Sequence, residues 1–561
     1  MQVRIRIPFR NTTAGTLAES EPPSYEAMPT STPAPPIRKR AALGDSSTVA
    51  VGILFSRIIG FVRERVFAHY FGGRSIYADA LRSAIRIPNL LSTLFGEGVL
   101  SAAFVTVYAK LRAQGEDKEA DHLAAAVFGI LSLVCAVMVL IGISATPLFI
   151  DLIVPGFHDE RRPLVTQMVR ILFPATGLLV MSAWCLGVLN SHRMFLLSYL
   201  APVALSLAVI VVTIAAGGTP ESRLVIDVAW GWLLGSLMQF LVQLPKVLQL
   251  LPGFRPVLDV KSQHVRTVLR NFGPVFVSRG VVQVSAYIDQ FIASFLPLGS
   301  VSILGFGQFI SILPVSLFSM SVSAAELPAL SRATGTPEEI AEYLRKRLSA
   351  GLRRIAFFII PSAVAFLVVG DIITAAIYQS GKFHRSDVVL VWAVLAGSSV
   401  GLLATSLGRL YSSAFYALLD TKTPLRFAMI RVTLTAILGW VCALFLPRWL
   451  GIGQEWGVAG LTASAGVAGW VEFVLLRHAL GDRIGKTAIA ASFTLRLWSV
   501  AISASAVSYF IKLGIGTGYP KLLACVALPV YGVLYFAGTA LLGVTESRNT
   551  INSVTRRIGL S

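Results

Sequence analysis

The chain has 561 residues, of which 55% are hydrophobic and only 14% are charged, and its mean hydropathy is +0.72. Soluble proteins carry about 25% charged residues, so this composition excludes the soluble class. The formal net charge is +19, from 48 Lys and Arg against 29 Asp and Glu. In a membrane protein such an excess is explained first by positive loops and anionic lipid headgroups. We therefore expect membrane lipids, and no nucleic acid, as partners.

The chain begins with a polar segment before its first apolar run. Residues 1–44 are rich in Pro, Ser and Thr, carry basic residues and lack the apolar core of a signal peptide, which predicts a disordered basic cytoplasmic tail. The four cysteines lie singly within apolar runs, without disulfide or metal-site spacing: Cys135, Cys185, Cys442 and Cys525. The seven histidines form no metal motif. The sequence thus predicts neither a metal site nor a resident cofactor, and it does not indicate an enzyme.

Apolar segments long enough to cross a bilayer fill the rest of the chain. We predict about fourteen transmembrane helices, at roughly 48–71, 76–111, 123–154, 164–189, 194–216, 224–250, 265–298, 301–330, 352–378, 388–419, 425–446, 458–476, 488–513 and 522–544. Segments of this length satisfy their own backbone hydrogen bonds in lipid only as helices. The predicted fold class is an all-α polytopic membrane protein.

Loop charges predict the orientation of these helices. Twenty basic residues lie in one set of loops, on the side of both basic termini, and nine lie in the opposite set. The positive-inside rule places the richer side and both termini in the cytoplasm. On that side, Thr336 to Glu339 form a capping box, and Ile340, Tyr343, Leu344 and Leu348 then share one helical face. We expect an amphipathic helix near 336–350 on the membrane surface.

Three short motifs recur 222 to 226 positions apart, in register with six spans. Ile87-Pro88 matches Leu313-Pro314, Gly156-Phe157-His158 matches Gly381-Lys382-Phe383-His384, and Leu200-Ala201-Pro202 matches Lys422-Thr423-Pro424. Repeats with an even number of spans are parallel. We predict an N-lobe at 45–250, a cytoplasmic linker at 251–264, a pseudo-symmetric C-lobe at 265–480, two added helices at 488–545 and a cytoplasmic tail at 546–561.

The segment 76–111 carries a continuous polar face. Its members follow one another at spacings of three or four: Asp79, Arg82, Arg86, Asn89, Thr93, Glu97 and Ser101. Ionised groups that face lipid cost several kcal/mol, so a span of this kind is expected to line water or a polar ligand. A short amphipathic surface helix is the alternative.

Arginines accumulate in the first two spans, against the positive-inside trend: Arg57, Arg63, Arg65, Arg82 and Arg86. A guanidinium group grips phosphate oxygens through two parallel hydrogen bonds. Clustered arginines in a cleft therefore indicate a phosphate or diphosphate ligand. Ion pairing inside the membrane with Glu64, Asp79 and Glu97 is the alternative, and the two interpretations are compatible.

Polar residues of two later spans are expected to line the facing side of the cleft. They are Arg279, Gln283, Asp289 and Gln290 in 265–298, and Gln308, Ser316, Ser319, Ser323 and Glu326 in 301–330. Asp289 is the candidate for a coupling ion or proton, with helix pairing as an equal alternative. Four other arginines are expected to extend to the membrane surface: Arg170, Arg409, Arg431 and Arg496. The segment 481–487 lacks phosphate-binding-loop spacing, which disfavours nucleotide hydrolysis.

Several motifs resemble the N-terminal signature of the MurJ (MviN) family. They are Ser56-Arg57-Ile58-Ile59-Gly60-Phe61-Val62-Arg63-Glu64, Phe71-Gly72, Ala78-Asp79-Ala80, Arg86-Ile87-Pro88-Asn89-Leu90-Leu91, Phe95-Gly96-Glu97-Gly98 and Ser101-Ala102-Ala103-Phe104. The resemblance covers about residues 45–545. It implies a flippase in the bacterial inner membrane that moves lipid II, the undecaprenyl-diphosphate-linked peptidoglycan precursor, for cell-wall synthesis. It also implies the fold of the multidrug/oligosaccharidyl-lipid/polysaccharide (MOP) exporters, and the cell-wall synthesis machinery as a candidate partner.

The resemblance also implies roles for single residues. Family arginines that bind the diphosphate match Arg57 and Arg63, and family gating carboxylates match Asp79 and Glu97. Two further family arginines are replaced here by Ser92 and Gln308. The predicted substrate-binding set is therefore Arg57, Arg63, Arg82, Arg86, Asn89, Arg279 and Gln308, with Asp289 as the ion-coupling residue. Spans 13 and 14 resemble the pair that cradles the polyprenyl tail.

Three questions stay open from the sequence. The energy source is either the membrane potential or a monovalent cation. The cargo is alternatively another polyprenyl-linked oligosaccharide or an amphipathic drug. A membrane scaffold that recruits partners through residues 1–44 and transports nothing is the third reading.

Overall fold

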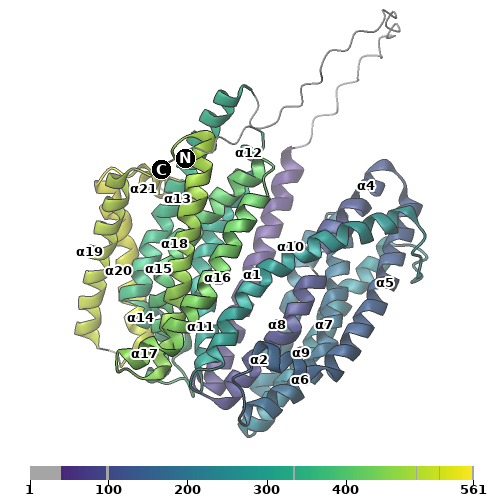
Figure 1. The fold of residues 1–561 in the computed structure, drawn as a ribbon, viewed down its shortest axis with the longest axis horizontal. Coiled ribbons are helices and arrows are strands. Elements are labelled where there is room, and N and C mark those ends of the chain that lie inside the picture. The colour runs from purple at the N-terminus through teal and green to yellow at the C-terminus, as the bar shows by residue number, and fades with distance from the viewer. Residues whose placement is uncertain (1–38, 97–99, 333–334, 488, 517, 559–561) are drawn as a thin grey trace, which may run out of the picture. The chain divides into compact units, whose positions relative to one another are not determined.

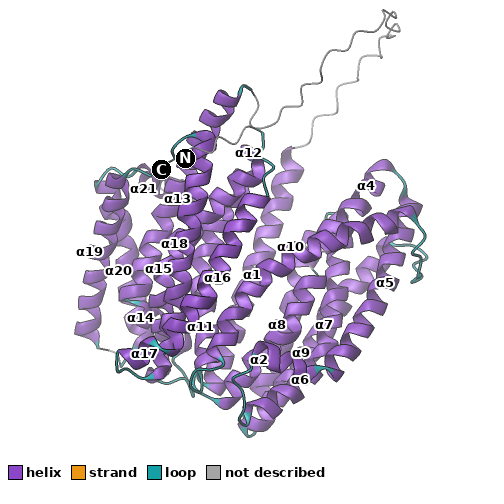
Figure 2. Ribbon diagram, viewed as in Figure 1, coloured by secondary structure: helices purple, strands orange, loops and turns teal. Residues whose placement is uncertain are grey.

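Helices form every regular element in the residues that the structure describes. This computed structural model describes 39–96, 100–332, 335–487, 489–516 and 518–558, and it holds no strand in these ranges (Figures 1 and 2). The all-α fold class is confirmed. Helix α1 already begins at Lys39, inside the predicted tail. The rest of that tail lies outside the described residues, as does Glu97.

The N-terminal half consists of α1 (Lys39–Phe71), α2 (Ile76–Phe95), the π-helix η1 (Ser101–Val105), α4 (Thr106–Gln114), α5 (Asp117–Ser144), α6 (Thr146–Ile153), α7 (Arg161–Ser191), α8 (Phe195–Ala215) and α9 (Glu221–Leu250). Helices α2, α5 and α9 pack on α7, and α8 packs on α9. A buried cluster around Trp184, Phe104 and Tyr108 holds the end of this half that contains η1 and α4. Predicted span 76–111 is thus built from three helical pieces, because α2 ends at Phe95.

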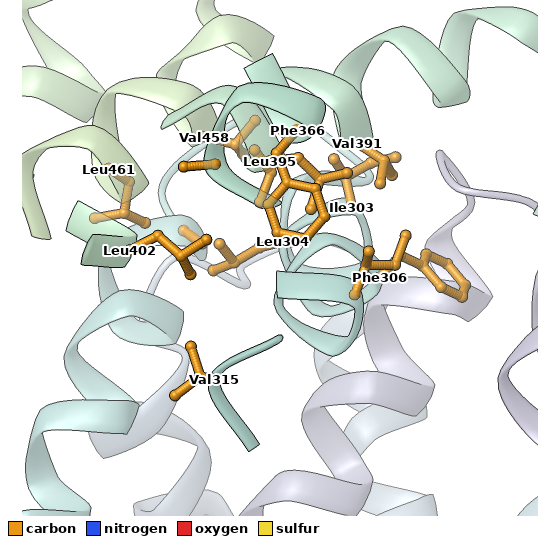
Figure 3. Close-up of a cluster of buried hydrophobic side chains, with 14 of the residues drawn as sticks. Ile303, Leu304, Phe306, Val315, Phe366, Val391, Leu395, Leu402, Val458 and Leu461 are labelled. Atoms are coloured by element: carbon orange, nitrogen blue, oxygen red, sulfur yellow. The ribbon is translucent and has the colours of Figure 1, made fainter. Parts of the chain in front are cut away.

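The C-terminal half consists of α10 (Gln263–Ala293), α11 (Ser300–Pro314), the π-helix η2 (Val315–Met320), α12 (Ser321–Leu330), α13 (Pro337–Val368), α14 (Gly370–Tyr378), α15 (Arg385–Ala417), α16 (Lys422–Leu444), α17 (Leu446–Trp449), the 3₁₀ helix η3 (Gln454–Trp456) and α18 (Gly457–Ile484). Its core gathers side chains of α11, α15 and α18, such as Leu304, Leu395 and Leu461 (Figure 3). Helices α15 and α18 approach so closely that a Cβ at Gly401 would lie 2.3 Å from the Cα of Gly466. Small residues permit this close packing, which stabilises helix pairs in lipid.

Three more helices complete the chain: α19 (Ala491–Ile515), α20 (Pro520–Leu541) and α21 (Thr545–Ile558). Pro361 in α13 lacks an N–H, so the carbonyl of Phe357 loses its donor within the helix. The hydroxyl of Tyr535 in α20 donates to that carbonyl at 2.6 Å, and Tyr531 donates to the carbonyl of Pro361 at 2.7 Å. These two buried bonds fix α20 against α13.

Eleven helices of the described residues are long and apolar enough to cross a membrane. The fourteen predicted spans include three further helices, α1, α2 and α10, which are not among these eleven. These three are the helices to which the sequence assigns most of the charged site residues. In α2 the charges account for its absence from the eleven, since every 18-residue window of this 20-residue helix contains Asp79, Arg82 and Arg86.

Helix α10 belongs to both halves. Its first turns bury Val265 and Val268 in the N-terminal cluster, and its Phe276 lies 5.1 Å from Phe95 of α2 between ring centroids. Its later turns contact α11, α16 and α18. The predicted C-lobe boundary at 265 assigns the whole of α10 to the C-terminal half. In the structure the apolar start of the helix packs against the N-terminal half.

The predicted surface helix near 336–350 is not a separate element. It forms the first turns of α13, which continues to Val368. The capping box at Thr336 is present, with Glu339 N–H donating to Thr336 Oγ1 at 3.3 Å. Leu344 and Leu348 are each 1% exposed, because they pack into the protein core and not against lipid headgroups. Likewise, the predicted tail at 546–561 contains α21, which Arg353 of α13 anchors through Glu546 at 2.7 Å.

The loop between α15 and α16 is held by Asp420. Burial alone would raise the pKa of this carboxyl, but hydrogen bonds from Thr423 and from Arg483, at 2.7 Å and 2.6 Å, lower it to about 2. We expect Asp420→Asn to cost about 1 kcal/mol of unfolding free energy at neutral pH. A carboxyl whose pKa is lower in the folded state than in the unfolded state stabilises the folded protein. This stabilisation is complete above the unfolded-state pKa, near 4, and is lost as the pH falls through the folded-state pKa, about 2.

This expectation is checked by thermal unfolding of the purified protein in detergent between pH 7 and pH 2. The difference in melting temperature between wild type and Asp420→Asn should shrink in the lower part of that range. Asp482→Asn is the matched control, because Asp482 is exposed and has no ion pair or hydrogen bond among the described residues. A difference that stays constant down to pH 2 would contradict the assignment.

Candidate functional site

The polar face of α2 changes from buried to exposed along the helix. Ser75 caps its start by accepting a hydrogen bond from Tyr77 N–H at 3.2 Å. Asp79, in the first turn, is 0% exposed, the side chain of Arg82 is 20% exposed, and Asn89, farther on, is exposed. The predicted polar stripe is therefore sealed at the start of α2 and accessible toward its other end.

Glu64 of α1 binds two arginines. Its carboxylate accepts from Arg63 at 3.4 Å and forms a short ion pair with Arg82 of α2. Arg63 also donates to Ser206 of α8 at 3.3 Å. The Glu64 side chain is 4% exposed, whereas those of Arg63 and Arg82 keep 18% and 20%. Two cations thus share one buried anion, and both arginine side chains keep partial exposure.

Aromatic rings support the same guanidinium groups. Arg63 lies 4.9 Å from the centre of the Trp232 ring of α9, and Arg82 lies 4.4 Å from that of Phe306 of α11. Such cation–π contacts stabilise a charge that water does not fully solvate. The site is thereby positioned by helices of both halves.

A second polar chain runs through Gln308 of α11. Arg86 of α2 donates to the side-chain oxygen of Gln308 at 3.4 Å. The side-chain NH₂ of Gln308 in turn donates to Asp289 of α10 at 3.2 Å. The hydroxyl of Tyr287 donates to the Arg86 carbonyl at 3.1 Å. The other carboxylate oxygen of Asp289 is buried without a hydrogen-bond partner among the described residues. The structure thus brings together three residues that the sequence singles out: Arg86, Gln308 and Asp289.

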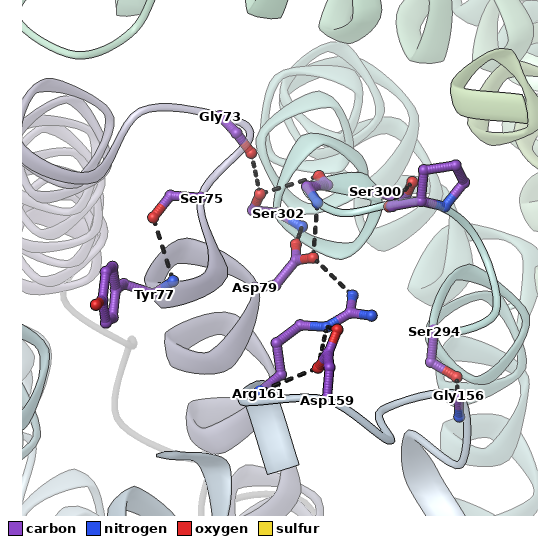
Figure 4. Close-up of polar contacts among 12 residues, drawn as sticks. Gly73, Ser75, Tyr77, Asp79, Gly156, Asp159, Arg161, Ser294, Ser300 and Ser302 are labelled. Carbon is purple, nitrogen blue, oxygen red and sulfur yellow. Dashed lines mark hydrogen bonds and ion pairs between the residues drawn. The ribbon is translucent and has the colours of Figure 1, made fainter. Parts of the chain in front are cut away.

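Asp79 joins the two halves at the start of α2 (Figure 4). Its carboxylate accepts backbone hydrogen bonds from Gly299 and Ser302, both at 2.8 Å, and so caps the N-terminus of α11. Arg161 of α7, which is 7% exposed, donates to the same carboxylate at 3.3 Å. Gly299 has a φ of +91°, and a Cβ there would lie 2.6 Å from the Cα of Arg74, so this position requires glycine.

Arg161 also organises the loop before α7. It donates through Nε to Asp159 at 2.9 Å. Burial raises the pKa of the Asp159 carboxyl, but the hydrogen bonds from Arg161 outweigh that effect and the pKa falls below its usual value. One guanidinium group therefore bridges two carboxylates, one of them fully buried.

Further contacts join the halves at the same place, which we call the closed end. Asp387 of α15 accepts from Gly73 N–H and from Arg74 Nε, both at 3.2 Å. Lys382 forms an ion pair with Glu221 of α9 at 2.6 Å. Nearby, Gly156 N–H donates to Ser294 Oγ at 3.1 Å (Figure 4). The loops before α2, α7, α11 and α15 are therefore bound together.

The structure does not unite every predicted site residue. Arg57 and Asn89 are exposed, and Arg57 makes no hydrogen bond or ion pair within the described part of the chain. The side chain of Arg279, like the whole of Glu97, lies outside what the structure describes. Arg161, Asp387, Glu221 and Lys382 were missed as site residues, because the sequence shows them only as charges in loops.

One of the expected surface-directed arginines is bound inside the C-terminal half. Arg431 of α16 forms an ion pair with Glu472 of α18 at 3.3 Å, and its side chain is 30% exposed. The expectation that it extends to the membrane surface is therefore wrong. The one indication of this ion pair in the sequence is Glu472, because it is a carboxylate within an apolar segment.

A profile of the family described as "Lipid II flippase MurJ" matches residues 67–524. The chain belongs to the MurJ family. A curated lipid II flippase MurJ from Burkholderia cenocepacia is 32% identical over 443 residues, covering 78% of this chain and 83% of the relative. A probable lipid II flippase MurJ from Bdellovibrio bacteriovorus is 30% identical, covering 78% and 82%.

Solved structures show the same fold. A structure titled "Lipid II flippase MurJ, inward closed conformation" superposes with a TM-score of 0.71 at 24% identity, covering 88% of this chain and 99% of that one. An inward-facing MATE-family transporter of the MOP superfamily superposes with a TM-score of 0.59 at 16% identity, covering 79% and 100%. The predicted MOP-type fold is thus confirmed for this MurJ-family chain, which is a multi-pass membrane protein.

Proposed function

We propose that this chain flips lipid II across the bacterial inner membrane by alternating access. The arrangement of Arg63, Glu64 and Arg82 carries the proposal, because it places two partly exposed arginine side chains on helices that lie within a membrane-spanning bundle. Fixed guanidinium pairs suit the paired phosphates of a diphosphate. The names of the family profile and of the curated relatives supply the cargo.

The binding step we propose is an exchange of partners. In the present state Glu64 pairs with both arginines, and its single negative charge leaves the cluster with one net positive charge. A diphosphate that approaches along the exposed part of α2 would compete with Glu64 for the guanidinium groups, and Arg86 and Asn89 lie farther along the same face. Because Ser92 and Gln308 stand where the family pattern has arginines, Arg82 and Arg86 supply the cations that those positions lack.

The closed end supports one state of an alternating-access cycle. Asp79, Asp387 and Lys382 bind the halves together there, while exposure on α2 increases away from it. We assign the closed end to the outer face and both termini to the cytoplasm, as the loop charges indicate. Transport would then require these contacts to open after lipid II has bound.

The polyprenyl tail would use an apolar groove on the C-terminal half. A cavity of about 430 Å³ lies between η2, α13 and α20, and Leu317, Phe358 and Phe536 are among its lining residues. This surface matches an aliphatic chain and offers almost no polar atoms. The head group and the tail would thus occupy separate sites on one transporter.

Coupling would act on the charged network. Moving one elementary charge across the membrane potential is worth about 2.3 kcal/mol per 100 mV, so a cationic site can be driven by the potential. Asp289 is the group that we propose for a monovalent cation or a proton, because one of its carboxylate oxygens is buried and unpaired within the described residues.

The test is complementation in bacteria depleted of their own flippase, together with native mass spectrometry of the purified protein with lipid II. We expect wild type to restore growth and to bind lipid II, and Arg82→Gln to lose growth and to bind at least tenfold more weakly at normal protein levels. Arg223→Gln, at an exposed arginine outside the site, is the matched control. Full growth with Arg82→Gln, or tighter binding of cationic drugs than of lipid II, would reject the proposal.

A further inference from the structure

A polar pocket lies on the outside of the N-terminal half, away from the Glu64 site. It has a volume of about 650 Å³ and lies between α7 and α9, which pack side by side. Helix α7 contributes a stripe at positions i, i+4 and i+8, formed by Arg162, Thr166 and Arg170, and Gln167 lies beside it. Trp230 of α9 forms the opposite wall. Neither the family assignment nor the proposed transport uses this pocket.

The pocket faces the lipid. Helix α9 carries a row of exposed large apolar side chains at helical spacing: Trp230, Leu234, Leu237 and Leu241. Both α7 and α9 have the length and hydropathy of membrane spans. An exposed apolar row on a spanning helix lies against acyl chains. Because Trp230 belongs to this row, Arg170 on the other side of the pocket also borders the lipid.

The pocket carries one uncompensated positive charge. Arg162 is neutralised by Asp151, whose two carboxylate oxygens both accept from it. Arg170 is exposed and forms no ion pair or hydrogen bond within the described residues. Asp227 lines a neighbouring hollow of about 600 Å³, between α8 and α9, that shares Trp230 with the pocket. An ionised arginine that faces lipid is costly unless it finds an anion or reaches the headgroups.

The depth of the pocket suits a lipid headgroup. Arg170 and Trp230 each lie nine residues after the start of their helix, about 14 Å along it at 1.5 Å per residue. A helix of 31 residues is about 46 Å long, roughly 8 Å longer at each end than a 30 Å hydrocarbon layer. Arg170 thus starts about 6 Å inside that layer, and its side chain leans toward the start of α7 and the headgroups.

We propose that this pocket binds an anionic phospholipid of the leaflet next to the closed end. The phosphate would lie against the guanidinium group of Arg170, with the Gln167 amide as a further hydrogen-bond donor; the Thr166 hydroxyl is not a donor to the lipid, because it donates to the Arg162 carbonyl at 2.8 Å. Trp230 would contact the glycerol region, as tryptophan does at membrane interfaces. The single uncompensated cation favours a lipid with a net negative headgroup over a zwitterionic one. This proposal does not depend on lipid II transport.

The test is native mass spectrometry of the full chain in detergent, titrated with dioleoyl phosphatidylglycerol and, separately, with dioleoyl phosphatidylcholine. We expect wild type to bind phosphatidylglycerol more tightly. Arg170→Gln should weaken that binding at least fivefold and leave the affinity for phosphatidylcholine unchanged. The affinity of Arg170→Lys for phosphatidylglycerol should fall in between, because lysine keeps the charge but lacks the paired N–H donors of the guanidinium group. Arg223→Gln removes an exposed arginine at the same end of α9, outside the pocket, and should bind as wild type does.

A second readout covers the case in which Arg170→Gln does not fold. Phosphatidylglycerol with brominated acyl chains should quench tryptophan fluorescence, and Trp230→Leu should lose a measurable part of that quenching. The proposal is overturned if Arg170→Gln binds phosphatidylglycerol as wild type does, if wild type does not distinguish the two lipids, or if Trp230→Leu leaves the quenching unchanged.

Discussion

Glu64→Gln is expected to abolish complementation and to lower the thermal stability of the protein strongly. Glu64 is 3% exposed and is the carboxylate that Arg63 and Arg82 share. Its neutralisation leaves two guanidinium groups facing each other without a counter-charge. Removing one partner of a buried ion pair costs about 3–5 kcal/mol. The measurement is the melting temperature of the purified variant in detergent, together with growth after depletion of the host flippase.

A double variant separates the structural role of Glu64 from the role of the arginines in binding. Glu64→Gln combined with Arg82→Gln removes one charge of each sign, so stability should recover in part. Growth should stay absent, because Arg82 is proposed to bind the diphosphate. If the double variant regains full growth, the arginine–glutamate cluster only holds helices together, and the diphosphate site must be sought elsewhere.

Asp79→Asn is expected to open the closed end and to stop transport. The Asp79 carboxylate accepts two backbone hydrogen bonds at the start of α11 and one bond from Arg161, and it is 0% exposed. Hydrogen bonds to a charged group contribute about 1.5–3 kcal/mol each. Asparagine keeps one acceptor and loses the charge, so we expect the closed state to lose about 3 kcal/mol of stability relative to the open state. This loss corresponds to a shift of about 100-fold in the equilibrium between the two states.

Cysteine labelling measures this shift. Ser300 is 4% exposed at the closed end, and a cysteine there should react slowly with a membrane-impermeant maleimide when the exposed Cys525 and the half-buried Cys442 have been replaced by serine. Asp79→Asn should raise the labelling rate severalfold in intact cells.

Asp151→Asn is the control for that experiment. It removes a carboxylate that pairs with Arg162 inside one half, so it should leave the labelling rate as it is. Equal rates in Asp79→Asn and in the unsubstituted background would show that Asp79 does not hold the halves together. Labelling only from the cytoplasmic side would contradict the orientation that we propose.

Helix α11 connects the two features that these variants address. Asp79 caps its start, the ring of Phe306 lies under Arg82, and Gln308 bridges Arg86 and Asp289. From Ser300 to Gln308 the helix rises only about 12 Å. A change at the closed end would therefore displace an element that directly contacts the charged site. This short connection is the structural basis on which ligand binding and opening can influence each other.

The sequence alone determined the class of the protein and much of its polar site. Hydropathy gave the helical membrane fold, and helical spacing placed Asp79, Arg82, Arg86 and Asn89 on one face of α2. These properties are local, because they depend on which residues stand three or four positions apart. The family motifs added the cargo by resemblance.

Only the tertiary structure decided which charges meet. Asp79 binds Gly299, Ser302 and Arg161, and Asp387 binds Gly73 and Arg74, across long separations in the chain. It also divided α10 between the halves and paired Arg431 with Glu472. No periodicity specifies such partners. A buried charge takes whichever opposite charge or backbone donor the packing of distant helices brings within hydrogen-bond distance.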